Sequence, residues 1–297
     1  PCDIHNEDDT GGPASTPLVD DGKVFTHSRN SDVFCFDTKT GKVLWSRHLF
    51  EEFEPKKPTF GFIASPRCQG DLLIIDAGIV FALNKNNGEI VWKTKDYVAT
   101  CSTPQILSYE GIDLVAVFNK VGLVLLKLET GEEFCVKPWT TPNFDTNTGT
   151  PLVDGNRVFI SSGFDGGFGL LELQSGAEPK TLWVNESIRT RNSLPVLWQG
   201  SLYAFDKAFM SCFDFDTGEL QWEEQFAHKG SITVAGGKML VLSEKGELVL
   251  VEPDPTGYKE LGRTHNIGAT CWSIPVLCNK RIYLRSSKGQ LVCLDVG

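Results

Sequence analysis

The sequence lacks the features that assign a chain to several large protein classes. Its longest apolar stretch, Leu72 to Leu83, contains Asp76 and is shorter than the ~20 apolar residues of a membrane-spanning helix. No segment repeats apolar residues with the i, i+3, i+4, i+7 spacing of an amphipathic helix, so we expect almost no helix. HExxH, GxSxG, Walker and GxGxxG motifs are all missing, and no signal peptide is visible. We therefore predict no membrane span and no catalytic residue.

Positive charge is also scarce. The 297 residues contain 28 Lys and Arg against 38 Asp and Glu, which gives a formal net charge of -10. No window holds a basic run long enough to offset this acidity. A polyanion would be repelled by such a chain, so we predict that it does not bind nucleic acid.

The nine cysteines include no CxxC motif and no adjacent pair. Cys35, Cys212 and Cys293 occur at the same place in a repeated pattern, each followed by an apolar residue and an aspartate. This repetition predicts small buried core residues rather than reactive thiols. Cys271 and Cys278 are close enough in sequence to bridge neighbouring strands, but spacing alone does not show a bond. We expect mostly free thiols.

A strand–turn–strand unit is repeated along the chain. Residues Cys35 to Trp45 return with identical spacing as Cys212 to Trp222, and a third copy runs from Ala82 to Trp92. Each copy reads as the end of a strand, a polar turn with glycine, and a short strand that closes on tryptophan. Glycine suits a turn position with positive φ, and Asp, Asn and Thr supply local side-chain hydrogen bonds.

A second signal precedes the turns: a small or apolar residue, a proline and an apolar strand. Six copies contain the proline, and Gly230 to Val234 supplies a seventh copy without it. The prolines are Pro17, Pro66, Pro104, Pro151, Pro195 and Pro275. Periods of ~40–50 residues with four short strands each are typical of a β-propeller. We predict an all-β fold in which residues 1–297 form a single propeller domain of four-stranded blades, with the tryptophans packed between neighbouring sheets.

Seven units are visible, and the last one ends at its third strand, Leu291 to Gly297. Either a strand near Ile4 supplies the missing fourth strand, or the chain is an eight-bladed ring that lacks its first blade. The chain begins at Pro1 rather than Met, so we expect processing or truncation upstream.

The Asp-x-x-Thr-Gly-x-x-x-Trp pattern at Asp37 to Trp45 resembles the quinoprotein, or PQQ-like, β-propeller repeat. The stretches Lys229 to Leu248 and Cys271 to Gly289 are similar to bacterial BamB-like members of this family. The resemblance covers nearly the whole chain and implies a periplasmic or otherwise exported protein. It also implies two functions, because the repeat occurs in non-catalytic scaffolds and in dehydrogenases that use PQQ and calcium.

The resemblance to the dehydrogenases brings no site that can be carried over residue by residue. They hold calcium with Glu, Asn and Asp, and calcium requires ~6–8 oxygen ligands. Asp145, Asp165 and Asp216 are available, but each lies where a turn would place an aspartate. The five histidines are scattered, and we predict no metal site.

The connections before each first strand suggest one binding site, because in a propeller they surround one mouth of the central channel. Three successive units place basic, polar and aromatic residues there: Arg189, Arg191, Asn192, His228, Lys229 and Trp272. Arginine grips anions and tryptophan stacks on ligands, so these residues predict a site for a protein, a peptide or a small anionic ligand. The alternative is that these side chains pair with loop carboxylates and pack the channel.

Two functions therefore remain open. The first is a non-catalytic propeller that binds a partner at the channel mouth and needs no cofactor. The second is a PQQ- and calcium-dependent dehydrogenase acting on an alcohol or sugar.

Overall fold

The computed structural model describes residues 14–141, 147–163, 166–186 and 194–297. These residues form seven antiparallel sheets and one short helix. The chain divides into two compact units. We call residues 12–182 the N-terminal unit, and residues 1–11 together with 183–297 the C-terminal unit. The prediction of one domain over residues 1–297 stays a prediction.

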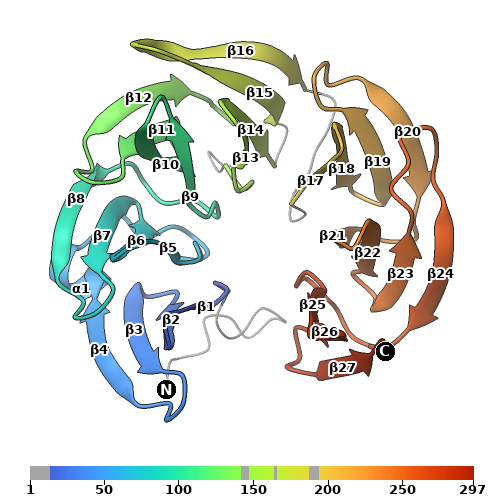
Figure 1. The fold of residues 1–297 in the computed structure, drawn as a ribbon, viewed down its shortest axis with the longest axis horizontal. Helices are drawn as coiled ribbons and strands as arrows, with labels where there is room; N and C mark the ends of the chain where they lie inside the picture. Colours follow the sequence, from blue (N-terminus) through green and yellow to red (C-terminus); the bar gives the residue numbers. More distant parts are fainter. Residues whose placement is uncertain (1–13, 142–146, 164–165, 187–193) are drawn as a thin grey trace. The chain divides into compact units, whose positions relative to one another are not determined.

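Each sheet is a blade in which every strand pairs with the next strand along the chain, as the repeats predict (Figure 1). The N-terminal unit holds four blades. Blade 1 consists of β1 (Leu18–Asp20), β2 (Lys23–His27), β3 (Asp32–Asp37) and β4 (Val43–His48), and blade 2 of β5 (Arg67–Gln69), β6 (Leu72–Ala77), β7 (Ile79–Asn84) and β8 (Ile90–Asp96). Blade 3 consists of β9 (Gln105–Tyr109), β10 (Ile112–Asn119), β11 (Gly122–Lys127) and β12 (Glu133–Pro138), and blade 4 of β13 (Leu152–Asp154), β14 (Arg157–Ser162), β15 (Gly167–Gln174) and β16 (Ala177–Asn185), the last strand ending in the C-terminal unit.

The C-terminal unit holds three blades. They are blade 5, β17 (Val196–Trp198), β18 (Ser201–Asp206), β19 (Phe209–Asp214) and β20 (Leu220–Gln225); blade 6, β21 (Gly230–Ala235), β22 (Lys238–Ser243), β23 (Glu247–Val251) and β24 (Glu260–His265); and blade 7, β25 (Val276–Cys278), β26 (Arg281–Arg285) and β27 (Leu291–Asp295). Blade 7 has three strands in the described part of the chain, as expected. The predicted closing strand near Ile4 lies outside the described residues.

The polar turns form because aspartate and glycine satisfy their geometry. Asp37 accepts the backbone N–H of Thr40 through Oδ1 at 2.7 Å, and Asp214 accepts that of Thr217 at 2.9 Å. The glycine that follows has positive φ, +72° at Gly218, a conformation that costs a residue with a Cβ ~1–2 kcal/mol. The spacing between aspartate and glycine is the same in both repeats because both residues are required by the same turn.

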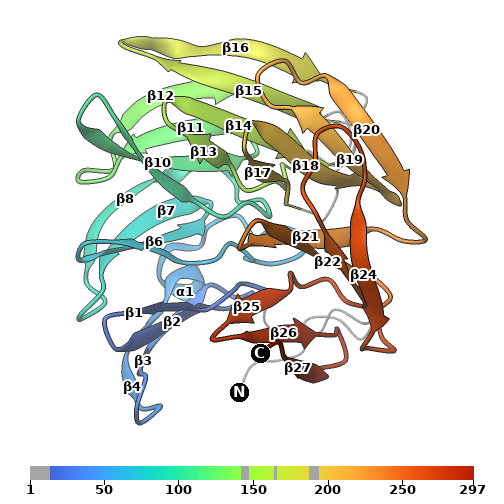
Figure 2. The same cartoon turned by 45° about the vertical axis from the view of Figure 1, so that its right-hand side comes forward.

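Tryptophans of the fourth strands connect consecutive blades, as predicted. Trp45 of blade 1 donates its indole N–H to the Lys85 carbonyl of blade 2 at 3.1 Å, and Trp92 donates to the Leu128 carbonyl of blade 3 at 2.8 Å. Figures 1 and 2 agree that blade 2 lies between blades 1 and 3 in the N-terminal unit. The core therefore lies between the sheets; one cluster combines Phe25 of blade 1 with Phe81 of blade 2.

The hydroxyl residues before the prolines form a second link between blades. The backbone N–H of Thr16 donates to the Ser65 hydroxyl at 2.9 Å, and that of Ser65 donates to the Thr103 hydroxyl at 3.1 Å. The N–H of Thr103 donates in turn to the Thr150 hydroxyl at 3.2 Å. The repeated Ser/Thr-Pro pair thus satisfies the backbone of the preceding blade in the N-terminal unit.

The helix α1 (Leu49–Phe53) is the one helix among the described residues, and it follows directly after β4. Its Leu49 is fully buried, Phe50 packs against Phe62, and Phe53 packs against Phe81. This single turn of helix covers the edge of the core between blades 1 and 2. None of the described residues forms a helix long and apolar enough to cross a membrane.

The cysteine prediction is confirmed at two of its three positions. Cys35 and Cys212 are fully buried, and burial raises the pKa of both thiols, to about 11 for Cys212. Cys293 is exposed, so the prediction of a buried residue is wrong there. Cys35 and Cys212 each lie between a second and a fourth strand, whereas Cys293 is on β27, the last strand of a three-stranded sheet. Cys271 and Cys278 are both free thiols.

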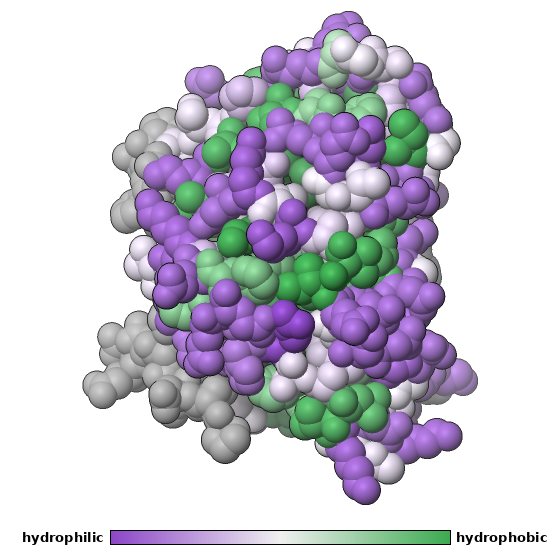
Figure 3. All heavy atoms as spheres, turned by 90° about the vertical axis from the view of Figure 1, so that its left-hand side faces the viewer, coloured by the Kyte–Doolittle hydropathy of each residue, from purple (hydrophilic) through white to green (hydrophobic). Residues whose placement is uncertain are grey.

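The outer surface of the N-terminal unit is mostly hydrophilic. Figure 3 faces the side of β4, β8 and β12 and shows separate small hydrophobic patches among polar residues. Val43, Leu44 and Val91 contribute exposed apolar side chains on β4 and β8. Scattered apolar residues of this kind are normal on a protein surface and indicate no binding site by themselves.

Candidate functional site

Three of the six residues predicted to form the binding site, Arg189, Arg191 and Asn192, lie outside the described residues. The other three, His228, Lys229 and Trp272, belong to the C-terminal unit. Lys229 and His228 precede β21 of blade 6, and Trp272 precedes β25 of blade 7. The structure brings Lys229 and Trp272 together.

Glu244 holds the two connections beside each other. The register of β21 and β22 pairs Gly230 with Ser243, which places Lys229 opposite Glu244. The N–H of Glu244 donates to the Lys229 carbonyl at 2.8 Å, and the Glu244 carbonyl accepts the N–H of Cys271 at 2.8 Å. Both backbone groups of one residue therefore position the Lys229 and Trp272 connections.

The side chains of these residues form one cluster, which we call the Lys229–Glu244–Trp272 cluster. The Trp272 indole N–H donates to Glu244 Oε1 at 2.8 Å, and Lys229 Nζ lies 3.5 Å from the same oxygen. Lys229 Nζ also lies 5.8 Å from the centre of the Trp272 ring, within the range of a cation–π contact. The carboxylate thereby fixes the orientation of the indole, whose side chain remains 43% exposed.

Sequence reasoning missed Glu244. It follows β22 by one residue, where the turn to β23 begins, and a turn glutamate has no distinctive sequence motif. Counting the β21–β22 hairpin outward from its turn would have placed it beside Lys229. His228 is partly buried and takes no part in the three contacts that define the cluster.

Exposed apolar side chains continue from the cluster along blade 7. Ile274, which precedes β25, is 46% exposed, and Val276, the first residue of β25, is 47% exposed. An aromatic residue next to exposed aliphatic residues is typical of a protein interface. This arrangement favours binding of an apolar or aromatic surface. The Lys229 charge is matched by Glu244, so an anion would depend on charges outside the cluster.

The described residues contain no group of three or more His, Cys, Asp or Glu side chains that could hold a metal ion. Asp216 lies in the turn after β19, where its backbone N–H donates to Asp214. Asp145 and Asp165 lie outside the described residues. The described side chains do not supply the oxygen ligands that a calcium ion with its quinone would need, and we derive no chemical step through such a group.

Comparison with known proteins supports the resemblance. The sequence profile of the family described as outer membrane protein assembly factor BamB matches residues 5–223. Outer membrane protein assembly factor BamB of Burkholderia pseudomallei is 24% identical over 292 residues, which cover 92% of this chain and 71% of that protein.

A dehydrogenase is also similar over part of its length. Quinoprotein alcohol dehydrogenase PedH of Pseudomonas putida KT2440 is 27% identical over 205 residues, which are 65% of this chain. This chain spans 31% of the length of PedH.

Among solved structures, the fold is similar to that of BamB from Moraxella catarrhalis, with a TM-score of 0.74 and 18% identity. The likeness covers 94% of this chain and 84% of that protein. The seven sheets are thus the blades of a β-propeller, as the repeats predict.

Proposed function

Because this chain belongs to the family of the outer membrane protein assembly factor BamB, we propose that it is a non-catalytic scaffold that binds another protein. The observation that carries this proposal is the exposed indole of Trp272, held by Glu244 beside the exposed Ile274 and Val276. A tryptophan fixed in place before binding loses little conformational freedom when a partner covers it. Such residues carry much of the binding energy in protein interfaces.

The name of the BamB relatives states that they are assembly factors for outer membrane proteins. We propose that the partner of this chain is a protein of the same assembly process, and that this chain is exported to the periplasm. We propose that Arg189, Arg191 and Asn192, which lie outside the described residues, also take part in partner binding, together with His228. A protein or peptide with an apolar surface and acidic flanks would suit these residues, because the apolar surface would cover Trp272 and the acidic flanks would pair with the arginines.

Site-specific photocrosslinking tests this proposal. A photoreactive benzoylphenylalanine replaces Trp272 in one protein and Val43, which is 52% exposed on β4 of the N-terminal unit, in a second protein. Each is mixed with a purified outer membrane β-barrel precursor kept unfolded in dilute urea. We expect a saturable crosslink from position 272 and none from position 43. Equal crosslinking from both positions, or no saturable binding, would refute the proposed surface.

The second candidate function is a quinone-dependent dehydrogenase, favoured by the 27% identity with PedH over 65% of this chain. It is tested by dye-linked oxidation of a panel of alcohols and sugars with PQQ and calcium added. Turnover above the control without quinone would replace the scaffold proposal. Turnover at the level of that control would leave the scaffold as the function.

A further inference from the structure

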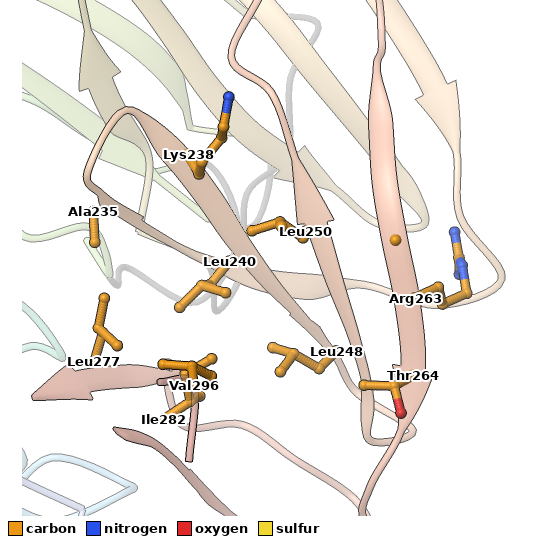
Figure 4. Close-up of a pocket in the computed structure, with 11 residues that line it drawn as sticks. Ala235, Lys238, Leu240, Leu248, Leu250, Arg263, Thr264, Leu277, Ile282 and Val296 are labelled. Atoms are coloured by element: carbon orange, nitrogen blue, oxygen red, sulfur yellow. The ribbon is translucent and has the colours of Figure 1, made fainter. Parts of the chain in front are cut away.

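A cavity of about 390 Å³ lies between blades 6 and 7 of the C-terminal unit. Its buried wall comes from Leu240, Leu248 and Ile282, which belong to the core cluster of these two blades. Leu277 and Val296 line it as well and are exposed. Figure 4 shows these aliphatic side chains around one space between the two sheets. The volume and the apolar lining are those of a small-molecule site, for which ~300–1,000 Å³ is usual.

The register of the sheets explains why the cavity exists. Gly262 of β24 lies opposite Leu250, directly before the irregularity in the pairing of β23 with β24. In blade 1, Trp45 holds the equivalent place opposite Cys35. Tryptophan also holds it in blades 2 and 5, at Trp92 and Trp222. Glycine therefore stands in blade 6 where three other blades place an indole that packs on the next blade.

The hydrogen-bond acceptor of that missing indole is present in blade 7. In blades 2, 3 and 5 the acceptor residue also donates its own N–H to a carbonyl at the start of the second strand or just before it: Lys85 to Asp71, Leu128 to Asp113 and Phe215 to Gly200. Their carbonyls accept the indole N–H groups of Trp45, Trp92 and Trp183. Val296 donates to Lys280 in the same way, so its carbonyl stands in the acceptor position.

Blade 3 shows how the chain fills such a place by other means. Cys135 replaces the tryptophan there, opposite Leu125. Tyr109 of β9 instead donates its hydroxyl to the Leu173 carbonyl of blade 4 at 3.4 Å. Between blades 6 and 7 the corresponding space holds the cavity. A Cβ built on Gly262 meets no atom within 4 Å.

We propose that the cavity between blades 6 and 7 binds a neutral, indole-type small molecule. The ring would occupy the place that tryptophan holds in the other blades, and its N–H would donate to the Val296 carbonyl. This site is separate from the Lys229–Glu244–Trp272 cluster and does not depend on a protein partner.

The charges beside the cavity favour a neutral ligand. Arg263 pairs with Glu260 at 2.8 Å and with Glu247 at 3.4 Å, and Lys238 lies 3.8 Å from Glu252. Each of these cations is already matched by a carboxylate. An anionic group on the ring would compete with those carboxylates for the two side chains, so it should add no affinity.

Binding of 5-fluoroindole to the purified chain, followed by fluorine NMR, tests the proposal. We expect saturable binding in the fluorine spectra. In proton NOE spectra of the complex with indole, we expect contacts from the ring protons to the methyl groups of Leu240 and Leu248. The variant Gly262→Trp should fill the cavity with its own ring, abolish binding and leave the melting temperature equal or higher. The control Gly268→Trp changes a glycine that also has open space around it but lies outside the cavity, and should bind as the wild type does.

Two comparison ligands test the chemistry. 1-Methylindole, which lacks the N–H, should bind about five- to tenfold more weakly, the effect of one hydrogen bond. A short peptide with one tryptophan tests whether the occupant is instead a side chain of a partner, and it should bind more weakly than indole. Absence of saturable indole binding, unchanged binding by a folded Gly262→Trp variant, or tighter binding of the peptide would each overturn the proposal.

Discussion

Trp45 packs so closely on Gly88 that a Cβ atom at Gly88 would lie 2.7 Å from the indole Cε3. Gly88 also has φ of +76°, a conformation that glycine adopts without steric cost. The turn of blade 2 therefore needs glycine for two reasons, its own backbone and the ring of the preceding blade. The tryptophan of one repeat thus packs directly on the turn glycine of the next repeat.

This contact predicts different costs for the same substitution in two blades. Gly41 has a similar φ of +66°, but a Cβ there meets no atom within 4 Å. Gly41→Ala should therefore cost only the backbone strain, ~1–2 kcal/mol of unfolding free energy. Gly88→Ala should cost a further ~1–3 kcal/mol because the ring must move. Thermal unfolding of the two variants measures the difference, and equal melting temperatures would contradict the contact.

The hydroxyl link between blades predicts a loss of stability in Thr103→Val. This substitution keeps the shape of the side chain but removes the oxygen that accepts the N–H of Ser65 at 3.1 Å. The unpaired N–H should cost ~1–2 kcal/mol in urea unfolding. Thr181→Val on β16 is the matched control at a partly buried position outside this link, and should change stability by less than ~0.5 kcal/mol. Equal effects of the two variants would show that the link does not stabilise the fold.

The buried, neutral ring of His27 leads us to expect a loss of stability in mild acid. Its Nδ1 donates to the Ala64 carbonyl at 2.9 Å and its Nε2 accepts the Ser31 hydroxyl at 3.0 Å, an arrangement that suits the neutral ring. Burial lowers the pKa of His27 from 6.5 to about 4. Between pH 6.5 and 4 the unfolded chain therefore binds a proton at His27 that the folded chain does not. The stability that the neutral His27 contributes is fully present above pH 6.5 and is lost as the pH falls toward 4.

The variant His27→Gln should lose that part of the pH dependence, although it is less stable at neutral pH. His48→Gln serves as the opposite control, because a hydrogen bond to Asp32 raises the pKa of His48. Its contribution is present below pH 6.5 and is lost as the pH rises through the raised pKa. Melting temperatures measured from pH 4 to 8 should therefore change slope in opposite directions in the two variants. A wild-type slope in His27→Gln would refute the assignment.

The buried carboxylate of Asp76 leads us to expect that its replacement by asparagine stabilises the fold. It is buried, its Oδ1 accepts the N–H of Gly78 at 2.8 Å, and its Oδ2 has no partner in the described part of the chain. Burial raises the pKa of Asp76 from 3.8 to about 7, so the folded state keeps a proton that the unfolded state releases. Stability is lost as the pH rises from ~4 to ~7.

Asp76→Asn removes this ionisation and keeps an acceptor for Gly78. The variant should melt at a higher temperature than the wild type at pH 8, with a smaller difference at pH 4. Asp216→Asn, which changes a turn carboxylate outside the core, is the control and should not show this pattern. A destabilised Asp76→Asn protein at pH 8 would contradict the buried, unpaired state of the carboxylate.

The sequence by itself determined the strands, the turns and the seven repeat units that correspond to the seven sheets of the described residues. These features depend on local chemistry: Asp37 caps its own turn, Gly88 accepts positive φ, and Pro17 precedes β1 without disturbing a ladder. Such effects act within a few residues, so they repeat wherever the motif repeats. The sequence also predicted that Lys229 and Trp272 lie in connections before first strands, and the structure places them before β21 and β25.

Only the tertiary structure decided what lies between the blades. The backbone of Glu244 bonds to Lys229 and Cys271, on two connections about 40 residues apart, and its side chain bonds to Trp272. No local sequence pattern marks this residue. The cavity beside Gly262 exists because blade 6 has glycine at the position where other blades have a tryptophan that packs on the next blade. Cys293 is exposed because no fourth strand covers β27 in the described residues, although its motif equals that of the buried Cys35. Burial depends on the neighbouring strand and sheet, which a motif read within one repeat does not contain.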